Sequence, residues 1–311
     1  MRAPAVAEYH HLVIPTLKVG GRDRALDSTL VMGVVNASPE SFSDAGRFAS
    51  LNSQLELAAS LIDSGADIID VGGQSAITNQ PELEASLESE RVLPIVEWLA
   101  DQHPEVLISV DTYKPTVVAA VLAAGAHIIN DVSGLRYPEV ASMCADHGAA
   151  LVIMHTAAPP KVRLQRHDLY SDITVEVRDF LAGTMEAAVD AGLSRDSVIL
   201  DPGPDFTKTP RQTVDLLRNI DALRSLGRPL LLALSRKDFL GAITGRTPKA
   251  RDAATAAAIA FFAASPGNIV RVHDVKAAVD VIATVETLTG KRDIAEDFVL
   301  PDSLRYEPPR E

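Results

Sequence analysis

The chain has 311 residues, of which 47% are hydrophobic and 23% are charged, and this balance excludes a mainly disordered protein. Its 42 acidic and 29 basic residues give a formal net charge of -13, which argues against nucleic acid and anionic membrane surfaces as partners. The single cysteine, Cys144, excludes an intrachain disulfide and a multi-thiolate metal site. The sequence also shows no signal peptide and no apolar stretch of the roughly 20 residues that cross a bilayer, so a cytoplasmic protein is expected.

Eight short runs of apolar, β-branched residues predict eight strands. They are continuously apolar, which is typical of strands that are covered on both faces. Segments with helical periodicity lie between them, near residues 52–65, 84–101, 115–124, 138–147, 171–191, 210–226, 251–264 and 274–289. The predicted strands are Leu30–Val35, Asp67–Val71, Val106–Val110, His127–Ile129, Leu151–Met154, Ser197–Leu200, Pro229–Ala233 and Asn268–Val272.

This alternation predicts an α/β fold, a single-domain (β/α)₈ TIM barrel, over residues 30–292. An open doubly wound sheet is the alternative, but it usually carries a glycine-rich phosphate turn after its first strand. Here the first strand is followed by Asn36-Ala37-Ser38-Pro39. Residues 1–29 are expected to form a short N-terminal extension, with a hairpin at the barrel bottom as one arrangement, and residues 293–311 a polar tail.

Polar side chains follow all eight predicted strands. In a TIM barrel the carboxyl ends of the strands build the active site, so these groups are expected to meet at one rim. Turns also favour Asn, Asp, Gly and Ser by themselves, and the functional interpretation therefore depends on the whole set. The set comprises Asn36, Gly72-Gly73-Gln74, Asp111, Asn130-Asp131, His155, Asp201, Ser235-Arg236-Lys237, Arg271 and His273-Asp274.

The set has a chemical character of its own. Its carboxylates and amide could bind a flat heterocycle with adjacent N–H and NH₂ groups, and its cations could hold a phosphate. Asn36 could supply one oxygen to a Mg²⁺ that water and phosphate otherwise coordinate. Other roles remain open: Asp111 and Asp201 could cap helices, Arg236 and Lys237 could be solvated charges, and His155 could be a core histidine.

These motifs resemble the dihydropteroate synthase family of pterin-binding (β/α)₈ enzymes. The resemblance runs from about Val31 to Leu288, with eight motifs in order at the strand ends. They are MGVVNASPESFSDAG (Met32–Gly46), DIIDVGGQS (Asp67–Ser75), ISVDTYKP (Ile108–Pro115), GAHIINDVSG (Gly125–Gly134), VIMH (Val152–His155), LDPGPDFTK (Leu200–Lys208), LSRKDFLG (Leu234–Gly241) and IVRVHDV (Ile269–Val275).

The resemblance implies a transferase of folate biosynthesis that joins a pterin methyl pyrophosphate to 4-aminobenzoate and releases pyrophosphate. It implies that Asp111, Asn130, Asp201 and Lys237 bind the pterin, and that Asp111, Asp201 and Lys237 carry the catalysis. It also implies that Asn36, Arg271 and His273 hold the pyrophosphate, with Asn36 on the Mg²⁺ cofactor. Phe206, Ser235 and Arg236 fall where the family receives the aminobenzoate. The resemblance further implies a homodimer, and the alanine-rich segment 253–262 would suit either dimer or core packing.

Three loops depart from the family pattern. The second loop reads Gln74-Ser75-Ala76-Ile77-Thr78-Asn79, where the family commonly has Glu-Ser-Thr-Arg-Pro-Gly. The sixth has Asp205 and Thr207 at positions that are usually glycine, and the seventh has Ala233 for glycine. Asp205 is expected to repel an anionic second substrate. The alternatives are therefore a pterin-binding homologue with an altered second substrate or little turnover, and, less favoured, pterin-dependent methyl transfer.

Overall fold

The computed structural model describes residues 14–37, 51–74 and 81–306, and eight parallel strands within these ranges close into a barrel. Neighbouring strands follow chain order, and the last pairs with the first, with Ile269 opposite Leu30. The predicted TIM barrel is thereby confirmed. The strands are β3 (Leu30–Asn36), β4 (Ile68–Gly72), β5 (Leu107–Asp111), β6 (Ile128–Asp131), β7 (Ala150–Met154), β8 (Val198–Asp201), β9 (Leu230–Leu232) and β10 (Asn268–Val272).

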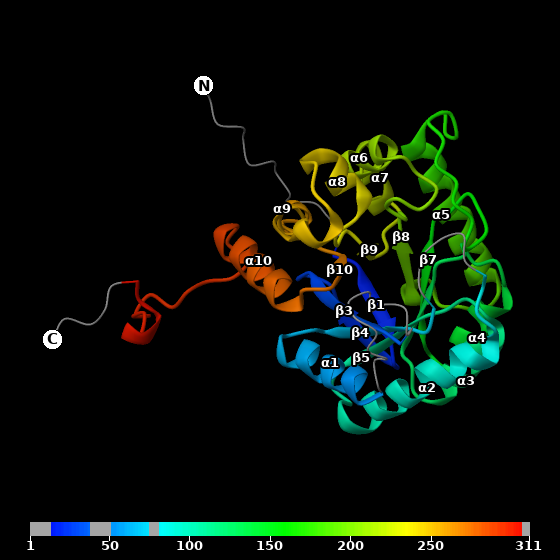
Figure 1. Ribbon diagram of the computed structural model, residues 1–311, viewed down its shortest axis with the longest axis horizontal. Helices are drawn as coiled ribbons and strands as arrows, with labels where there is room; N and C mark the ends of the chain where they lie inside the picture. Colours follow the sequence, from blue (N-terminus) through cyan, green and yellow to red (C-terminus); the bar gives the residue numbers. More distant parts are fainter. Residues whose placement is uncertain (1–13, 38–50, 75–80, 307–311) are drawn as a thin grey trace.

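Helices surround the strands on the outside of the barrel (Figure 1). Glycines end several of them, as at Gly125, where φ is 105° and a side chain would be strained. In the part of the chain that the structure describes, no helix is long and apolar enough to cross a membrane. The helices are α1 (Leu51–Asp63), α2 (Ala85–Gln102), α3 (Pro115–Ala123), α4 (Glu139–Asp146), α5 (Ile173–Asp190), α6 (Pro210–Arg218), α7 (Asp221–Arg224), α8 (Asp238–Thr244), α9 (Asp252–Ala263) and α10 (Val275–Leu288).

Two helix predictions need correction. The segment 210–226 is not one helix, because the helix breaks at Asn219, whose N–H donates to Leu216 O in a tighter turn before α7 begins. The seven-residue α8 follows β9 and was not predicted at all. Helix α8 has fewer than two turns, includes Gly241 and ends at Gly245. Its apolar residues therefore show too little helical periodicity to be recognised in the sequence.

A hairpin precedes the barrel, formed by β1 (Thr16–Val19) and β2 (Arg22–Ala25). The turn uses two successive glycines with positive φ, and the first of them, Gly20, donates its N–H to Gly148 O just before β7. The side chains of Leu17 and Val19 are buried among the apolar residues that fill the lower barrel. The hairpin therefore lies at the amino-terminal ends of the strands, opposite the predicted site.

The interior of the barrel changes from apolar to polar along its axis. Its lower part is filled by apolar side chains such as Met32, Ala150 and Leu231. Because side chains alternate between the two faces of a strand, the next inward position lies two residues further on. Two residues beyond Ile68, Ile128, Ile199 and Ile269 come Asp70, Asn130, Asp201 and Arg271. The strands themselves thus bring a layer of charged and polar side chains to one level of the barrel.

Candidate active site

Arg271 is the centre of this polar layer. Its Nε donates to Asp70 Oδ2 at 2.6 Å, and its Nη2 lies 3.2 Å from Asp111 Oδ2. Asp70 also accepts from Ser109 Oγ at 2.6 Å and from Asn130 Nδ2 at 3.3 Å. Residues from β4, β5, β6 and β10 are therefore joined in one hydrogen-bonded network across the barrel.

Two groups in this network are poised to accept hydrogen bonds. Burial raises the pKa of Asp111, an effect that Arg271 opposes and that the carboxylate of Asp70 reinforces. The side chain of Asn130 is 2% exposed, and its Oδ1 is buried without a hydrogen-bond partner among the described residues. A buried acceptor without a partner is costly, so a ligand with N–H groups would be favoured here.

Asp201 lies in the same layer, on β8. Its Oδ1 accepts from Gly203 N at 2.7 Å, and burial raises its pKa to about 6 although Lys237, Lys208 and Arg271 favour the charged form. Burial likewise lowers the pKa of Lys237, against the opposing effect of Asp205 and Asp201. The Lys237 ammonium lies 4.4 Å from the centre of the Phe206 ring, so the two side chains form a cation–π pair.

The loop after β8 holds Phe206 between two residues with positive φ, Asp205 at 64° and Thr207 at 53°. Glycine suits such backbone best, but here both side chains form bonds that compensate the strain. Thr207 Oγ1 accepts from Ala157 N at 3.0 Å and lies 3.1 Å from Tyr170 Oη. The two substitutions therefore tie the loop to its surroundings.

The carboxylate of Asp205 is bonded within the protein. Its carboxylate accepts from Thr213 Oγ1 at 3.1 Å and from Phe239 N, in the first turn of α8, at 3.2 Å. Burial raises the pKa of Asp205, whereas these two donors and nearby Lys237 favour its charged form. The repulsion of an anionic substrate by Asp205 stays a prediction.

Lys208 and His155 form a buried pair beneath the same loop. The Lys208 ammonium, fully buried, lies 2.9 Å from His155 Nδ1 and donates to Gly203 O at 2.9 Å and Phe206 O at 3.0 Å. Burial and the Lys208 charge lower the pKa of His155 to about 3, so the imidazole is neutral. His155 is therefore a core histidine, one of the roles that the sequence left open for it, and it supports the loop through Lys208.

The loop after β9 carries Ser235 and Arg236. Ser235 Oγ lies 2.9 Å from Nδ1 of His273 on the neighbouring strand end. Partial burial and the charges of Arg236 and Arg271 lower the pKa of His273. Arg236 is paired with Asp252 on α9, with Nε 2.7 Å from Oδ1, and so is not a freely solvated charge. The backbone carbonyls of Arg236 and Lys237 are held in turn by Nη1 of the buried Arg251, at 2.8 and 3.0 Å.

Asn36 ends β3 beside the network. The adjacent strand ends in Gly72, where a Cβ would lie 3.8 Å from Asn36 Oδ1 and 3.7 Å from Asp111 Cβ. Asn36 Oδ1 and the side chain of Asp111 thus flank the space that a side chain at Gly72 would occupy, and amide and carboxylate oxygens are ligands that Mg²⁺ binds. The described residues contain no group of three or more His, Cys, Asp or Glu that could hold a metal alone. The donor set therefore fits a Mg²⁺ that takes most of its ligands from a phosphate and from water.

The remaining rim residues lie outside the network. Asp131 points to the opposite face of β6 from Asn130, and its Oδ1 accepts from Ser133 N at 2.6 Å, so it serves the turn. Gln74 accepts from Leu83 N at 2.5 Å and closes the base of the second loop, while Ala233 is buried. The sequence also predicts that Ile77 cannot make the ionic contact with Asp44 that an arginine at its position could make, but both residues lie outside the described ones.

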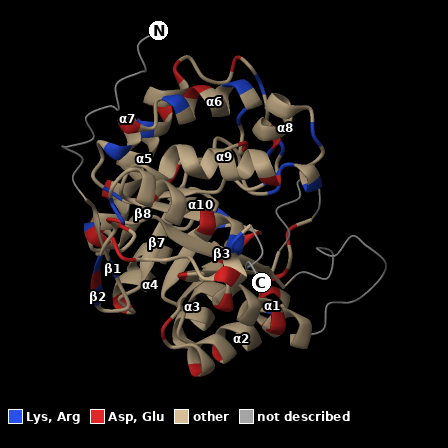
Figure 2. Cartoon of the chain, turned by 90° about the vertical axis from the view of Figure 1, so that its left-hand side faces the viewer, with Lys and Arg blue, Asp and Glu red and all other residues tan. Residues whose placement is uncertain are grey.

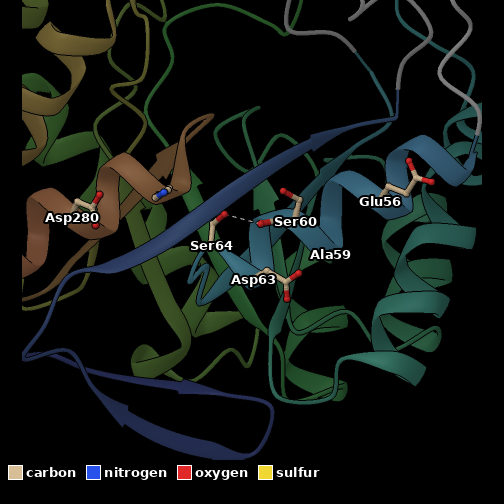
Figure 3. A pocket seen from close by; sticks show the side chains of 7 residues that line it. Glu56, Ala59, Ser60, Asp63, Ser64 and Asp280 are labelled. Carbon is tan, nitrogen blue, oxygen red and sulfur yellow. Dashed lines mark hydrogen bonds between the residues drawn. The ribbon is translucent and has the colours of Figure 1, made fainter. Parts of the chain in front are cut away.

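A separate surface hollow of about 650 Å³ lies between α1 and α10, on the outside of the barrel (Figure 3). Ser64 Oγ donates to Ser60 O at 2.7 Å at its base. Acidic residues also mark α1 and α2 more widely, whereas α6 and α7 carry both charges (Figure 2). The hollow includes no predicted site residue; its lining is Glu56, Ala59, Ser60, Asp63, Ser64, Lys276 and Asp280.

A TIM barrel whose strand ends bring carboxylates, an amide and several cations together is typical of enzymes with a polar, charged active site. Residues 32–273 match the model of the pterin binding enzyme family, and the chain belongs to that family. A dihydropteroate synthase from Streptococcus pyogenes is 38% identical over 261 residues, 83% of this chain and 95% of its own length. The predicted family resemblance is thereby confirmed.

Solved structures agree with this assignment. The dihydropteroate synthase of Xanthomonas albilineans with 4-aminobenzoic acid has a TM-score of 0.81 and 36% identity, covering 89% of this chain and 98% of that one. The enzyme of Burkholderia cenocepacia complexed with 7,8-dihydropteroate has a TM-score of 0.79 and 35% identity, covering 89% and 97%. The similarity thus extends over nearly the whole barrel.

Sequence reasoning missed three residues that organise the site: Asp70, Lys208 and Arg251. Asp70 and Lys208 lie inside the motifs DIIDVGGQS and LDPGPDFTK, but neither stands at the end of a predicted strand. Asp70 could have been found because a lone carboxylate inside an apolar run must be buried with a partner. Nothing in the sequence distinguishes Arg251 from a surface arginine.

Proposed function

We propose that this protein is a dihydropteroate synthase, which transfers the pterin-methyl group of a pterin methyl pyrophosphate to the amine of 4-aminobenzoate and releases pyrophosphate. The observation that carries the proposal is the single polar layer in which acceptors and cations meet. Asp111, Asn130 and Asp201 supply the acceptors, and Lys237 and Arg271 supply the charge that an anionic leaving group needs. The relatives named above support it.

The acceptors suit the pterin ring. A pterin presents adjacent N–H and NH₂ donors at one edge, and Asn130 Oδ1 is an acceptor that has no other partner among the described residues. The pKa values of Asp111 and Asp201 are raised by burial, so the arrival of N–H donors would favour their charged forms. A carboxylate so placed also stabilises positive charge that develops on the pterin methylene as pyrophosphate departs.

The basic edge suits the leaving group. Arg271 and the neutral His273 would contact the pyrophosphate, and Asn36 would contribute an oxygen to Mg²⁺. The Mg²⁺, when bound, would neutralise charge on the departing pyrophosphate. In the transfer, the carbon–oxygen bond to pyrophosphate breaks, the amine nitrogen bonds to the methylene, and the amine then loses a proton.

Phe206, Ser235 and Arg236 are proposed to receive the aminobenzoate. Phe206 offers a ring face close to Lys237, and Arg236 offers a guanidinium whose orientation is set by Asp252. The position of Asp205 supports turnover, because its carboxylate is bonded below the loop. We therefore favour an active synthase over a homologue that only binds a pterin.

A steady-state assay with pterin pyrophosphate, 4-aminobenzoate and Mg²⁺ tests the proposal. We expect pyrophosphate release that requires the amine, and a fall of about 100-fold in kcat/KM for Lys237→Gln, because the variant loses a buried charge at the reacting centre. Lys18→Gln, on the exposed edge of the hairpin, should keep full activity. Calorimetric binding of pterin pyrophosphate without release would favour the binding homologue, and binding of neither ligand would refute both.

We also propose a cytoplasmic homodimer. The acidic net charge of -13 supports a location away from anionic membrane surfaces. For the dimer, α9 and α10 pack on each other, yet Phe261 and Leu288 on their outer sides are 68% and 82% exposed. We propose that these two side chains belong to the dimer interface, since a contiguous exposed apolar patch is typical of contacts between protein chains. Sedimentation velocity should show a dimer for the wild type and a monomer for Phe261→Asp; a monomeric wild type would refute the dimer.

A further inference from the structure

Asp70 stands out among the buried charges because it lies at a junction of four strands. It is in the middle of β4, its side chain is fully buried, and its carboxylate accepts hydrogen bonds from three other strands. The donors are Arg271 Nε at 2.6 Å, Ser109 Oγ at 2.6 Å and Asn130 Nδ2 at 3.3 Å. Two of these donors belong to residues that we place on the substrate, one at each end of it.

Folding alone gives no reason for a charge at this position. The interior level below Asp70 is filled by apolar side chains, among them Ile68 and Ile128, and the same pattern could have continued upward. Buried ion pairs are often matched or exceeded in stability by apolar side chains of similar volume, because both charges must leave water. The pair between Asp70 and Arg271 is therefore better explained by what it orients than by the stability it adds.

At Arg271 the carboxylate restricts how the guanidinium can turn. Nε is bonded to Asp70, and the planar group then directs Nη2 toward Asp111 at 3.2 Å. Nη1 takes part in neither bond. Because the Arg271 side chain is 22% exposed, the part of it that Asp70 does not bind can face the barrel mouth. Without Asp70 the long side chain would be free to pair with Asp111 alone.

At Asn130 the carboxylate decides which way the amide faces. An ionised carboxylate can only accept hydrogen bonds, so the NH₂ group must be the part that meets Asp70. The amide oxygen is thereby turned away from Asp70, and this Oδ1 is buried without a partner among the described residues. A neutral side chain at position 70 would no longer determine this orientation.

We propose that Asp70 is a positioning residue, whose carboxylate holds the Arg271 guanidinium toward the pyrophosphate and the Asn130 amide oxygen toward the pterin. The inference deepens the proposed function and rests on it. It predicts that one substitution weakens both halves of the ligand, although Asp70 itself touches neither. A residue that merely supports the fold would lower the free energy of unfolding and leave the affinities of the folded protein unchanged.

Isothermal titration of the full chain tests this with two probes, pterin pyrophosphate with Mg²⁺ and the 6-hydroxymethyl pterin that lacks the pyrophosphate. We expect Asp70→Asn to weaken the first by about tenfold or more, since a charged hydrogen bond to Arg271 is lost, and the second by about three- to tenfold, since Asn130 can now turn over. The KM for 4-aminobenzoate should stay within about twofold.

Asp67→Asn is the matched control. Asp67 immediately precedes β4 and also pairs with an arginine, with Oδ1 3.0 Å from Arg24 Nη2, but it lies at the opposite end of the barrel. We expect this variant to bind both probes like the wild type. Unchanged affinities in a folded Asp70→Asn protein, or equal losses in both variants, would overturn the inference.

A second variant covers the case in which Asp70→Asn does not fold. Asp70→Glu keeps the charge that Arg271 needs, but it moves the carboxylate by one methylene and so displaces both donors. We expect affinity losses in the same order, largest for pterin pyrophosphate. Wild-type affinities for both probes would overturn the inference. A wild type that binds neither probe would instead refute the proposed function, and the inference with it.

Discussion

The replacement Asp201→Asn tests whether burial or the surrounding cations dominate at the bottom of the site. Asp201 is 3% exposed, and Lys237, Lys208 and Arg271 all favour its charge, yet its pKa rises from 3.8 to about 6. The cost of removing the carboxylate from water therefore exceeds the combined stabilisation of its charge by the Gly203 hydrogen bond and three cations. The difference in pKa corresponds to about 3 kcal/mol that the folded protein loses when the group ionises.

The sign of this effect sets the pH dependence. The pKa of Asp201 is higher in the folded than in the unfolded protein. The stability that protonated Asp201 contributes is therefore complete below pH 3.8 and is lost as the pH rises through about 6. Asparagine is neutral at every pH and can still accept from Gly203 N. We therefore expect Asp201→Asn to gain stability relative to the wild type as the pH rises, by about 1.5 kcal/mol between pH 5 and pH 8, while synthase activity is lost.

Urea unfolding followed by circular dichroism at pH 5, 6, 7 and 8 measures the gain. Asp190→Asn, at the exposed end of α5, is the control and should follow the pH dependence of the wild type. A wild type that becomes more stable than Asp201→Asn as the pH rises would show that the cations outweigh burial. The reasoning about this carboxylate would then be wrong.

Two further predictions concern the scaffold. A Cβ at Gly241 would overlap the guanidinium of Arg251, so Gly241→Ala should lower the free energy of unfolding by about 1–3 kcal/mol and raise the KM for aminobenzoate. Gly183→Ala is the control, because a Cβ at this position inside α5 would meet no atom within 4 Å. It should raise the free energy of unfolding by about 0.5–1 kcal/mol. Arg228 is buried and donates to Thr16 O, Asp196 O and Val198 O, so Arg228→Lys should cost about 2–3 kcal/mol in urea unfolding because one ammonium cannot reach them all. Arg211→Lys, at an exposed arginine, should lower the free energy of unfolding by under about 0.5 kcal/mol. Equal losses of stability in the Arg228 and Arg211 variants would contradict the argument.

Local pattern was enough to predict the barrel and most of its rim. Continuous apolar runs separated by helical segments determine the order of strands and helices, and parallel strands that close into a barrel bring all their carboxyl ends to one side. For this reason the sequence alone predicts that Asp111, Asn130 and Asp201 lie close together. Short elements carry less information, and α8 was missed for that reason.

Which polar groups bind each other was decided only by the tertiary structure. Asp70 and Arg271 are separated by 201 residues, and the pair forms because strand register sets both at one level of the barrel. Asp205 looks repulsive in the sequence, but the fold places Thr213 and the first turn of α8 where they donate hydrogen bonds to its carboxylate. Alternation along a strand is a local property and can be read from the chain, whereas the partner of a buried charge depends on register and packing between distant segments.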